Sequence, residues 1–264
     1  TEKQISEKIS AFLDQSEGSP AIALTQGFMG ATPGGDTTTL GREGSDYTAA
    51  IFAYALQADE MVIWKDVPGL LNADPKYFSR TEKLASISYR EAIELSYYGA
   101  TIIHPKTIKP LQNKDIPLRI KSFVKPGDEG SIIQNDTAAD SLIPSFIFKV
   151  DQVLISIIPR DFSFIDEQSL SEILAVFASN SIHISLMQNS AISFSVCVDN
   201  NQRKLSRLFE ELGKDYKVRY NTGLELITIR HYDQATIDRV MEDGKTVLLE
   251  MRSRLTAQFV ARPH

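Results

Sequence analysis

Apolar and polar positions in the first half of the chain alternate in blocks that favour helices and strands in turn. Apolar residues recur at helical spacing from Ile5 to Leu13 and predict a first helix. The alanine-rich segment 47–58 is apolar nearly all round, which is typical of a buried helix. Short apolar runs predict buried strands at residues 21–27, 61–64 and 116–122.

Two further helices carry recognisable start and stop signals. Ser88 and Glu91 have the spacing of a capping box, and Gly99 is placed to end the helix that they begin. Pro105 is well placed to begin another helix that runs to Lys114. Strands that alternate with helices predict an α/β fold, with a mostly parallel sheet covered by helices on both faces.

The pattern changes after a segment rich in Pro, Gly and Asp at residues 123–143, which predicts a boundary between domains 1–143 and 144–264. Beyond it, the order strand, helix, strand, strand, helix, strand is that of a ferredoxin-like βαββαβ unit. A weak repeat follows, because LITIRHYD (226–233) matches LISIIPRD (154–161). The second copy is incomplete, so we expect it to share elements with the first copy or with a partner chain.

Composition narrows the class of protein. Apolar residues make up 42% of the chain and charged residues 23%, the ordinary mix of a globular protein. The net charge of −6 argues against nucleic acid as a partner. Apolar runs stay short of the ~18 residues that a membrane span requires, and the charged segment 1–15 does not resemble a signal peptide. We therefore expect a cytoplasmic protein with no membrane partner, in which the single cysteine, Cys197, is a small buried hydrophobe.

The strongest chemical signal is the segment TTTLGREGSDYTAA (37–50), a polar loop with an arginine that leads directly into a predicted helix. Helix N-termini attract anions, and the planar fork of Arg42 suits a carboxylate. Asp46 offers the opposite charge to an ammonium group. Arg42 and Asp46 together therefore predict a receptor for an amino acid zwitterion. The alternative is that Ser45 or Asp46 only caps the helix, which is worth ~1 kcal/mol.

This segment closely resembles the aspartate kinase motif TTTLGRGGSD, with Glu43 where the family commonly has glycine. The resemblance implies that the loop Arg42, Glu43, Gly44 and Ser45 holds the substrate aspartate. It also implies that Asp46 is the catalytic residue, which orients the substrate and a catalytic lysine.

A second segment, IWKDVPGLLNADPK (63–76), follows an apolar strand and resembles the part of the amino-acid kinase superfamily that contacts adenine and ribose. Nucleotides bind at the carboxyl ends of strands in open α/β sheets. The alternative is an ordinary strand-to-turn connection. The resemblance implies four nucleotide-binding residues: Lys65, Asp66, Leu71 and Lys76.

A third segment, YYGATIIHPKTIKPL (97–111), resembles the family's FGAKVLHPATL stretch. Thr101 stands where many relatives carry a nucleotide-contacting lysine and is a fifth candidate for the nucleotide site. Either Lys106 or another cation compensates, or ATP binding is weaker. His104 is expected to cap or pack at a helix start rather than to catalyse.

The resemblance implies the transfer of the ATP γ-phosphate to the side-chain carboxylate of L-aspartate, the first step toward lysine, threonine and methionine, with ATP and Mg²⁺ as cofactors. Such a carboxylate ionises near ~3.9, so the reaction needs positioning and charge neutralisation rather than a general base. The family's K-F-G-G-T phosphate loop does not occur in this sequence. We therefore expect little kinase activity from these 264 residues alone. No protein-built metal site is expected, because His183 and His231 lie in apolar strand patterns with no cysteine or carboxylate at the spacing of metal ligands.

Residues 144–264 resemble paired ACT domains, which follow the kinase domain in aspartate kinases and bind amino acids. The resemblance implies a regulatory amino acid, which we leave open between lysine, threonine and none. Because open sheet edges are usually covered, the incomplete second copy predicts a homodimer in which these domains pair across chains. Lysine-inhibited relatives often carry an aspartate at the position of Ser185. Two alternatives remain for the whole chain, a non-catalytic amino-acid-binding regulatory subunit and another amino-acid kinase. The expected effector-binding residues are Ser163, Ser169, Leu170, Ile184, Ser185 and Asn189.

Overall fold

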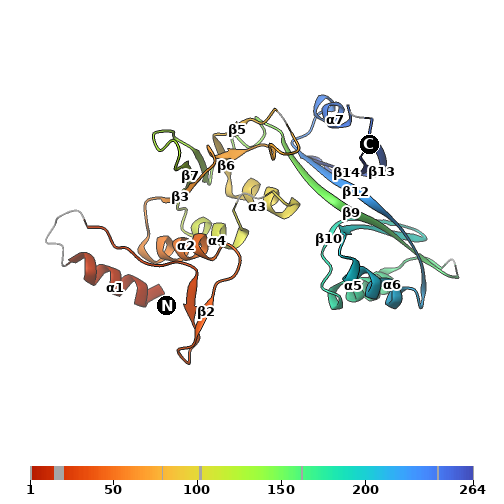
Figure 1. Ribbon diagram of the computed structural model, residues 1–264, viewed down its shortest axis with the longest axis horizontal. Helices are drawn as coiled ribbons and strands as arrows, with labels where there is room; N and C mark the ends of the chain where they lie inside the picture. Colours follow the sequence, from red (N-terminus) through yellow and green to blue (C-terminus); the bar gives the residue numbers. More distant parts are fainter. Residues whose placement is uncertain are drawn as a thin grey trace. The chain divides into compact units, whose positions relative to one another are not determined.

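The chain folds into two compact units, Thr1–Ile143 and Pro144–His264, in the computed structural model (Figure 1). The structure describes residues 2–14, 21–78, 80–100, 103–161, 163–242 and 244–263. None of the helices in these ranges has the length and apolar character that a bilayer crossing requires.

The first unit is built around a four-stranded sheet in the order β3-β7-β8-β6. The β3–β7 and β6–β8 pairings are parallel and the β7–β8 pairing is antiparallel, so the sheet is mostly parallel as predicted. The strand β8 was not predicted, because it lies inside the segment that was interpreted as a domain boundary. The strands are β3 (Met61–Lys65), β6 (Ser86–Ser88), β7 (Leu118–Ser122) and β8 (Ser131–Gln134), with a separate two-residue ladder of β4 (Leu70–Leu71) and β5 (Lys83–Leu84).

The helices of the first unit begin and end close to the predicted positions. They are α1 (Glu2–Asp14), α2 (Gly44–Leu56), α3 (Tyr89–Tyr98) and α4 (Pro105–Asn113). The Oγ of Ser88 accepts a hydrogen bond from the backbone N–H of Glu91 at 3.0 Å and caps α3. Gly99 ends that helix with φ 110°, a left-handed conformation that glycine adopts easily. Pro105 occupies the first turn of α4.

The strand that was predicted at residues 21–27 is wrong. These residues have no regular secondary structure, and Ile22 and Leu24 are 90% and 95% exposed. An apolar run forms a strand only where a neighbouring strand pairs with its backbone, and none of the described strands does so here. The glycine- and threonine-rich loop that follows contains a short hairpin of β1 (Met29–Ala31) and β2 (Thr37–Thr39).

The second unit has the predicted βαββαβ order, made by β9 (Ser145–Pro159), α5 (Glu167–Ser179), β10 (Ile184–Ser190), β11 (Ser193–Asp199), α6 (Gln202–Leu212) and β12 (Tyr216–Arg230). The second copy adds α7 (Gln234–Met241), β13 (Thr246–Arg252) and β14 (Thr256–Arg262). All its strands join one antiparallel sheet in the order β10-β11-β9-β12-β14-β13.

The two copies share their longest strands. Residues 154–159 of β9 pair with residues 216–221 of β12 in the first copy, and residues 145–149 pair with residues 226–230 in the second. The prediction that the incomplete copy shares elements with the first copy is therefore confirmed. A single pair of 15-residue strands replaces the shorter separate strands that the repeat suggested.

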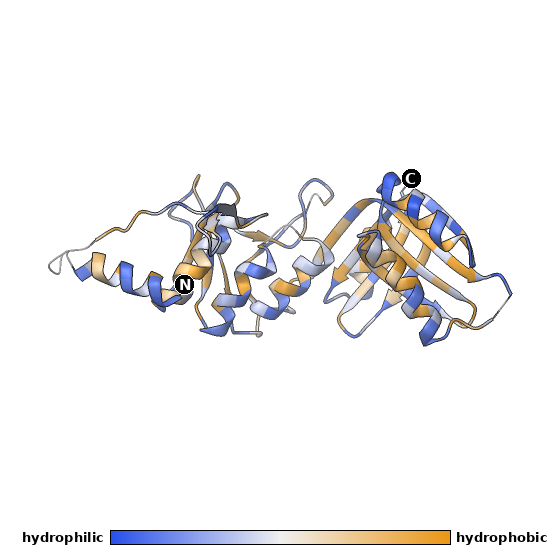
Figure 2. Ribbon diagram, turned by 90° about the horizontal axis from the view of Figure 1, so that it is seen from below, coloured by the Kyte–Doolittle hydropathy of each residue, from blue (hydrophilic) through white to orange (hydrophobic). Residues whose placement is uncertain are grey.

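Both faces of this sheet carry apolar residues, and its strands are mostly orange in Figure 2. One cluster packs under α5 and α6 and includes Ile155, Phe177 and Leu208. A second cluster includes Leu154 and Cys197, which alternate with residues of the first. Burial raises the pKa of the Cys197 thiol to about 12. The thiol is therefore protonated at neutral pH, and the cysteine is the buried hydrophobe that was predicted.

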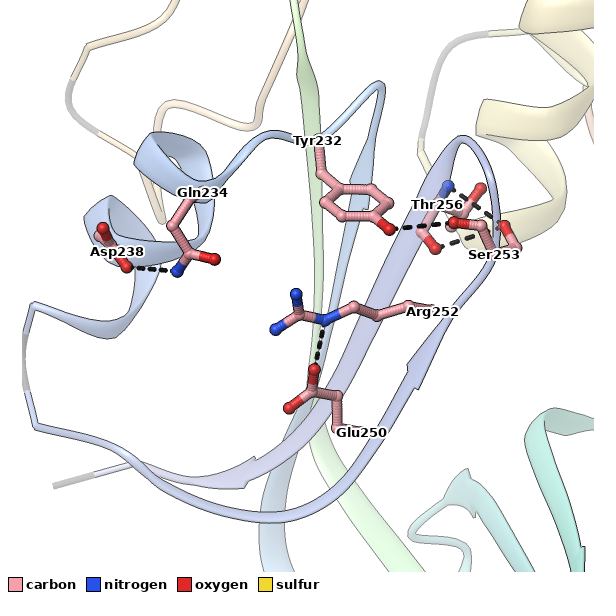
Figure 3. A network of polar contacts seen from close by, with 7 residues as sticks. All are labelled: Tyr232, Gln234, Asp238, Glu250, Arg252, Ser253 and Thr256. Atoms are coloured by element: carbon pink, nitrogen blue, oxygen red, sulfur yellow. Dashed lines mark hydrogen bonds and ion pairs between the residues drawn. The ribbon is translucent and has the colours of Figure 1, made fainter.

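Polar contacts fix the last hairpin beside α7 (Figure 3). The hydroxyl of Tyr232 donates to the backbone oxygen of Ser253 at 3.0 Å, and the N–H of Ser253 donates to the oxygen of Thr256 at 2.8 Å. Arg252 forms an ion pair with Glu250, and its guanidinium lies 6.0 Å from the ring of Tyr232. These contacts order the turn between β13 and β14, so the second copy is a folded part of the unit.

Candidate active site

The first turn of α2 is packed so closely that its first residue has to be glycine. A Cβ at Gly44 would lie 2.7 Å from the ring of Phe28 and 3.1 Å from the Cβ of Leu40. A Cβ at Gly27 would lie 3.1 Å from the Cα of Ser45. The end of the apolar segment 21–27 therefore lies against the start of the helix, and the loop that carries the arginine packs on the same turn.

Neither Ser45 nor Asp46, the two candidates for a simple cap, caps helix α2. The residue at its N-cap is Glu43, which makes no side-chain cap hydrogen bond. The hydroxyl of Thr48 donates to the backbone oxygen of Gly44 at 2.8 Å and accepts from the N–H of Phe28 at 3.0 Å. The interpretation of Ser45 or Asp46 as only a cap is therefore wrong, and both side chains are available for other contacts.

Asp46 forms an ion pair with Lys65, which comes from the end of strand β3. The Nζ of Lys65 lies 3.8 Å from the Oδ2 of Asp46, and the two side chains are 32% and 22% exposed. Burial raises the pKa of the Asp46 carboxyl above its ordinary value of 3.8, and the Lys65 ammonium offsets only part of that rise. A further positive charge near Asp46 would therefore favour its ionised form.

The predicted nucleotide residues Lys65 and Asp66 lie at the carboxyl end of β3. The backbone oxygen of Lys65 accepts a hydrogen bond from the N–H of Phe123 at 2.8 Å, which holds the ends of the parallel strands β3 and β7 together. The rings of Trp64 and Phe123 are 5.6 Å apart, and the ammonium of Lys121 lies 5.3 Å from the centre of the Trp64 ring. This edge of the sheet therefore combines exposed aromatic surface with positive charge.

Two of the other predicted nucleotide residues belong to the segment that follows β3. Leu71 belongs to the short ladder of β4 and β5, and Lys76 is exposed in a turn where its N–H donates to Asp74 at 2.9 Å. Within the described parts of the chain, no hydrogen bond or ion pair joins either residue to the first turn of α2. Thr101 lies outside the described residues.

Two residues at the start of α4, the N-cap His104 and Lys106, contact the loop that carries Arg42. His104 caps α4 by accepting the N–H of Lys106 at its Nδ1, 3.2 Å away, as expected for a helix start. Its own N–H donates to the Oε2 of Glu43 at 2.7 Å. The ammonium of Lys106 donates to the backbone oxygens of Leu40, at 3.0 Å, and of Arg42. Lys106 is therefore a contact of the loop, a role that the sequence did not predict.

A cavity of about 320 Å³ lies beside Arg42, on the side of the loop that faces α3 and α4. Its volume falls in the range of small-molecule sites. Asp46 is not among its lining residues. Within the described residues, His, Cys, Asp and Glu do not gather in groups of three that could hold a metal ion. The cavity is lined by Arg42, Glu43, Ser96, Gly99, Ala100, Ile103, His104 and Pro105.

Three of the predicted effector residues lie at the start of α5. The N–H and the hydroxyl of Ser169 donate to the capping carboxylate of Asp166, at 2.9 and 2.7 Å. Leu170 packs on the core of the unit. The N–H of Ser163 donates to Asp161 at 3.1 Å. Ser169 therefore contributes to the cap of the helix, and its hydroxyl is already engaged.

The other three lie along β10. Ile184 packs on the cluster beneath α5 and α6. The hydroxyl of Ser185 accepts a hydrogen bond from the ammonium of Lys149 at 3.1 Å, and Asn189 is exposed near the end of the strand. A cation of the chain itself thus lies next to Ser185.

Known proteins that are similar to this chain are amino acid kinases. Residues 1–122 match the model of the amino acid kinase family. Lysine-sensitive aspartokinase 3 of Escherichia coli (strain K12) is 32% identical over 216 residues, which cover 79% of this chain and 48% of that protein. The aspartokinase of Geobacillus stearothermophilus is 31% identical over 217 residues, which cover 79% of this chain and 52% of that protein. Both of these relatives are aspartokinases.

Solved structures extend the likeness to both units. Escherichia coli aspartokinase III in complex with lysine and aspartate has a TM-score of 0.75 at 27% identity, covering 98% of this chain and 61% of that one. The aspartate kinase of Clostridium acetobutylicum, 24% identical, shares the fold with a TM-score of 0.76, covering 89% of this chain and 58% of that one. The chain spans about half the length of the curated relatives it matches.

The ion pair between Lys65 and Asp46 predicts a stability effect that depends on pH. Because the pKa of Asp46 is raised in the fold, its protonated form is favoured there. Protonation of Asp46 therefore stabilises the fold. This stabilisation is fully present below the ordinary pKa of 3.8 and is lost as the pH rises through the raised pKa. Lys65→Met is therefore expected to lower the free energy of unfolding at pH 7, by up to about 1 kcal/mol for a partly exposed pair, and to have little effect below pH 3.8.

Urea unfolding of the wild type and Lys65→Met at both pH values measures this difference. Asp46→Asn serves as the matched variant and should be at least as stable as the wild type at pH 7, because it removes the half-buried charge. An equal loss at both pH values for Lys65→Met would show that its effect does not come from Asp46.

Proposed function

We propose that the full-length protein is an ATP-dependent aspartate kinase, which transfers the γ-phosphate of ATP to the side-chain carboxylate of L-aspartate and forms 4-phospho-L-aspartate. The observation that carries the proposal is the 3.8 Å contact between Asp46 and Lys65. It joins the loop expected to hold the amino acid to the strand end expected to hold the nucleotide. A kinase needs these two sites side by side.

The substrate is proposed to bind at the first turn of α2. Arg42 is exposed beside a cavity and can present two N–H groups to a carboxylate. Ser45 is exposed on the first turn of the helix, whose N-terminus favours anions. Asp46 is the group for the substrate ammonium, because a second cation would relieve the cost of its burial. Escherichia coli aspartokinase III has been solved in complex with aspartate, which supports this choice of substrate.

The nucleotide is proposed to bind at the carboxyl ends of β3 and β7. Lys65 supplies a cation for the phosphates, and the exposed carboxylate of Asp66 is a suitable oxygen ligand for Mg²⁺. A magnesium ion that bridges phosphates usually takes only one or two carboxylates from the protein, so these residues fit it without a three-residue cluster. When bound, the ion neutralises charge on the phosphates. Escherichia coli aspartokinase III has been solved with aspartate and ADP, which supports the nucleotide.

Arg42, Asp46 and Lys65 suit a reaction that is catalysed by holding the two reactants in position. The attacking carboxylate of aspartate is ionised at neutral pH, so no side chain has to remove a proton. What remains is to hold two anionic reactants together, and this requires cations and a fixed orientation. Arg42 and Lys65 supply positive charge, and Asp46, which forms an ion pair with Lys65, orients both the substrate and Lys65.

A non-catalytic regulatory subunit is the competing function. Such a protein would gain nothing from a glycine packed against Phe28 at the start of α2, or from a lysine held beside Asp46. The first unit retains both features, which favours the kinase. Another amino-acid kinase is disfavoured because the relatives of this chain are aspartokinases.

We also propose that the protein is a cytoplasmic enzyme of lysine, threonine and methionine synthesis, regulated by lysine or threonine at its second unit. The aspartokinase of Escherichia coli that matches over both units was solved with lysine bound. In this chain the ammonium of Lys149 lies 3.1 Å from the hydroxyl of Ser185, where a cationic side chain would be repelled. Of the two amino acids, threonine therefore suits this position better.

Replacing Arg42 by Met tests the kinase directly. Loss of a charged hydrogen bond to a carboxylate, worth ~1.5–3 kcal/mol, should lower kcat/KM for aspartate by about 10- to 100-fold. The measurement is aspartate-dependent ADP release by the full-length protein. Arg90→Met is the matched control, because Arg90 is exposed on α3. Equal kcat/KM values for the wild type and Arg42→Met would contradict the proposal.

Calorimetric titration with threonine and with lysine tests regulation. Binding of threonine should release or absorb heat and should change the kinase rate. Ser185→Asp should improve lysine binding, because a carboxylate beside Lys149 offsets its charge. If neither amino acid gives heat, the second unit is a dimerisation module without an effector.

We further propose a homodimer formed through the second unit, because among its described strands β10 and β13 end the sheet, and proteins usually cover such edges. Light scattering of the full-length protein should give twice the mass of one chain. A monomer at micromolar concentration would contradict this proposal.

A further inference from the structure

Glu43 occupies a backbone conformation that usually belongs to glycine. Its φ and ψ are 54° and 34°, in the left-handed region, where a side chain is unfavourable. The neighbouring Gly41, with φ 73°, shows the residue type that such geometry normally selects. An unfavourable conformation of this kind persists where surrounding contacts hold it, and it often marks a functional site.

The contact that holds Glu43 comes from α4. Its Oε2 accepts the backbone N–H of His104 at 2.7 Å. His104 is the N-cap of α4, so the carboxylate of Glu43 lies at the positive end of that helix. The side chain of Glu43 is therefore directed to the start of α4.

A second contact runs in the opposite direction, from α4 to the loop. The ammonium of Lys106 donates to the backbone oxygens of Leu40, at 3.0 Å, and of Arg42. The same ammonium lies 5.6 Å from the centre of the Tyr47 ring on α2. An anion from the loop is thus held by α4, and a cation from α4 is held by the loop. We call this pair of contacts, made by Glu43 and Lys106, the α2–α4 clasp.

We propose that the α2–α4 clasp sets the position of Arg42 for the amino acid substrate, so that Glu43 and Lys106 are positioning residues for aspartate binding. The contacts hold the backbone on both sides of the arginine. Lys106 holds the carbonyls of Leu40 and Arg42, and the hydrogen bond from His104 holds Glu43, the residue after the arginine. Because the backbone before and after Arg42 is held in place, the guanidinium starts from a fixed backbone position. The inference rests on the proposed function, because it concerns the same substrate site.

The clasp predicts a specific kinetic effect. Glu43→Ala keeps a side chain in the left-handed conformation but removes the contact with His104. It should raise the KM for aspartate about tenfold and leave the KM for ATP within about twofold, because the nucleotide edge at β3 is not part of the clasp. Lys106→Met should also raise the KM for aspartate about tenfold. The double variant should be less than additive, since the two contacts fix the same loop.

Conservative variants separate positioning from general destabilisation. Glu43→Gln can still accept the N–H of His104 and should recover most of the aspartate KM. Lys109→Met is the matched control for Lys106→Met, because Lys109 is exposed on the same helix, and it should leave both KM values unchanged. Amide hydrogen exchange at His104 should be faster in Glu43→Ala than in the wild type and unchanged in Lys109→Met.

The outcomes distinguish this inference from the proposed function. If the full-length wild type does not phosphorylate aspartate, the proposed function and the inference both fail. If the wild type is active and Glu43→Ala changes neither the aspartate KM nor the exchange at His104, only the inference fails. Equal rises in the KM for aspartate and for ATP would also overturn it, because they would indicate a loss of structure rather than a loss of Arg42 positioning.

Discussion

The contact between Asp46 and Lys65 is the interaction on which the candidate site depends. A half-buried carboxylate is unfavourable without a nearby cation, and Lys65 supplies only part of what burial costs. The two residues come from different elements, the first turn of α2 and the end of β3. Their charges therefore tie the loop that carries Arg42 to the sheet edge where nucleotides bind in α/β folds. The remaining need for positive charge at Asp46 matches the ammonium group of an amino acid.

Close packing makes that contact possible. Gly44 allows α2 to start against Phe28 and Leu40, where any larger residue would collide. The helix therefore begins immediately before Ser45 and Asp46, and places both in its first turn. Helix α4 approaches the same loop and contacts it through Glu43 and Lys106. Three segments that are distant in sequence thus meet at one helix start, each held by a contact of a different kind: packing, an ion pair and hydrogen bonds.

The sequence predicted most elements of the fold, because apolar periodicity and capping residues act locally. Ser88, Gly99 and Pro105 mark helix ends that the structure confirms. The failures concern long-range pairing. Residues 21–27 have the composition of a strand but no neighbouring strand to pair with, whereas β8 pairs with two strands from within a segment that looks like a linker. In the site, the motif around Arg42 and Asp46 could be found by type and spacing. The contacts of Lys65 and Lys106 could not, since they depend on how separate elements pack.

A crystal structure of the full-length protein with L-aspartate and a non-hydrolysable ATP analogue tests the central claim most directly. The account predicts that the carboxylate of the amino acid contacts the guanidinium of Arg42, that its ammonium lies within hydrogen-bond distance of Asp46, and that the nucleotide phosphates lie beside Lys65. Aspartate bound away from the first turn of α2, or an ATP analogue remote from the end of β3, would contradict it.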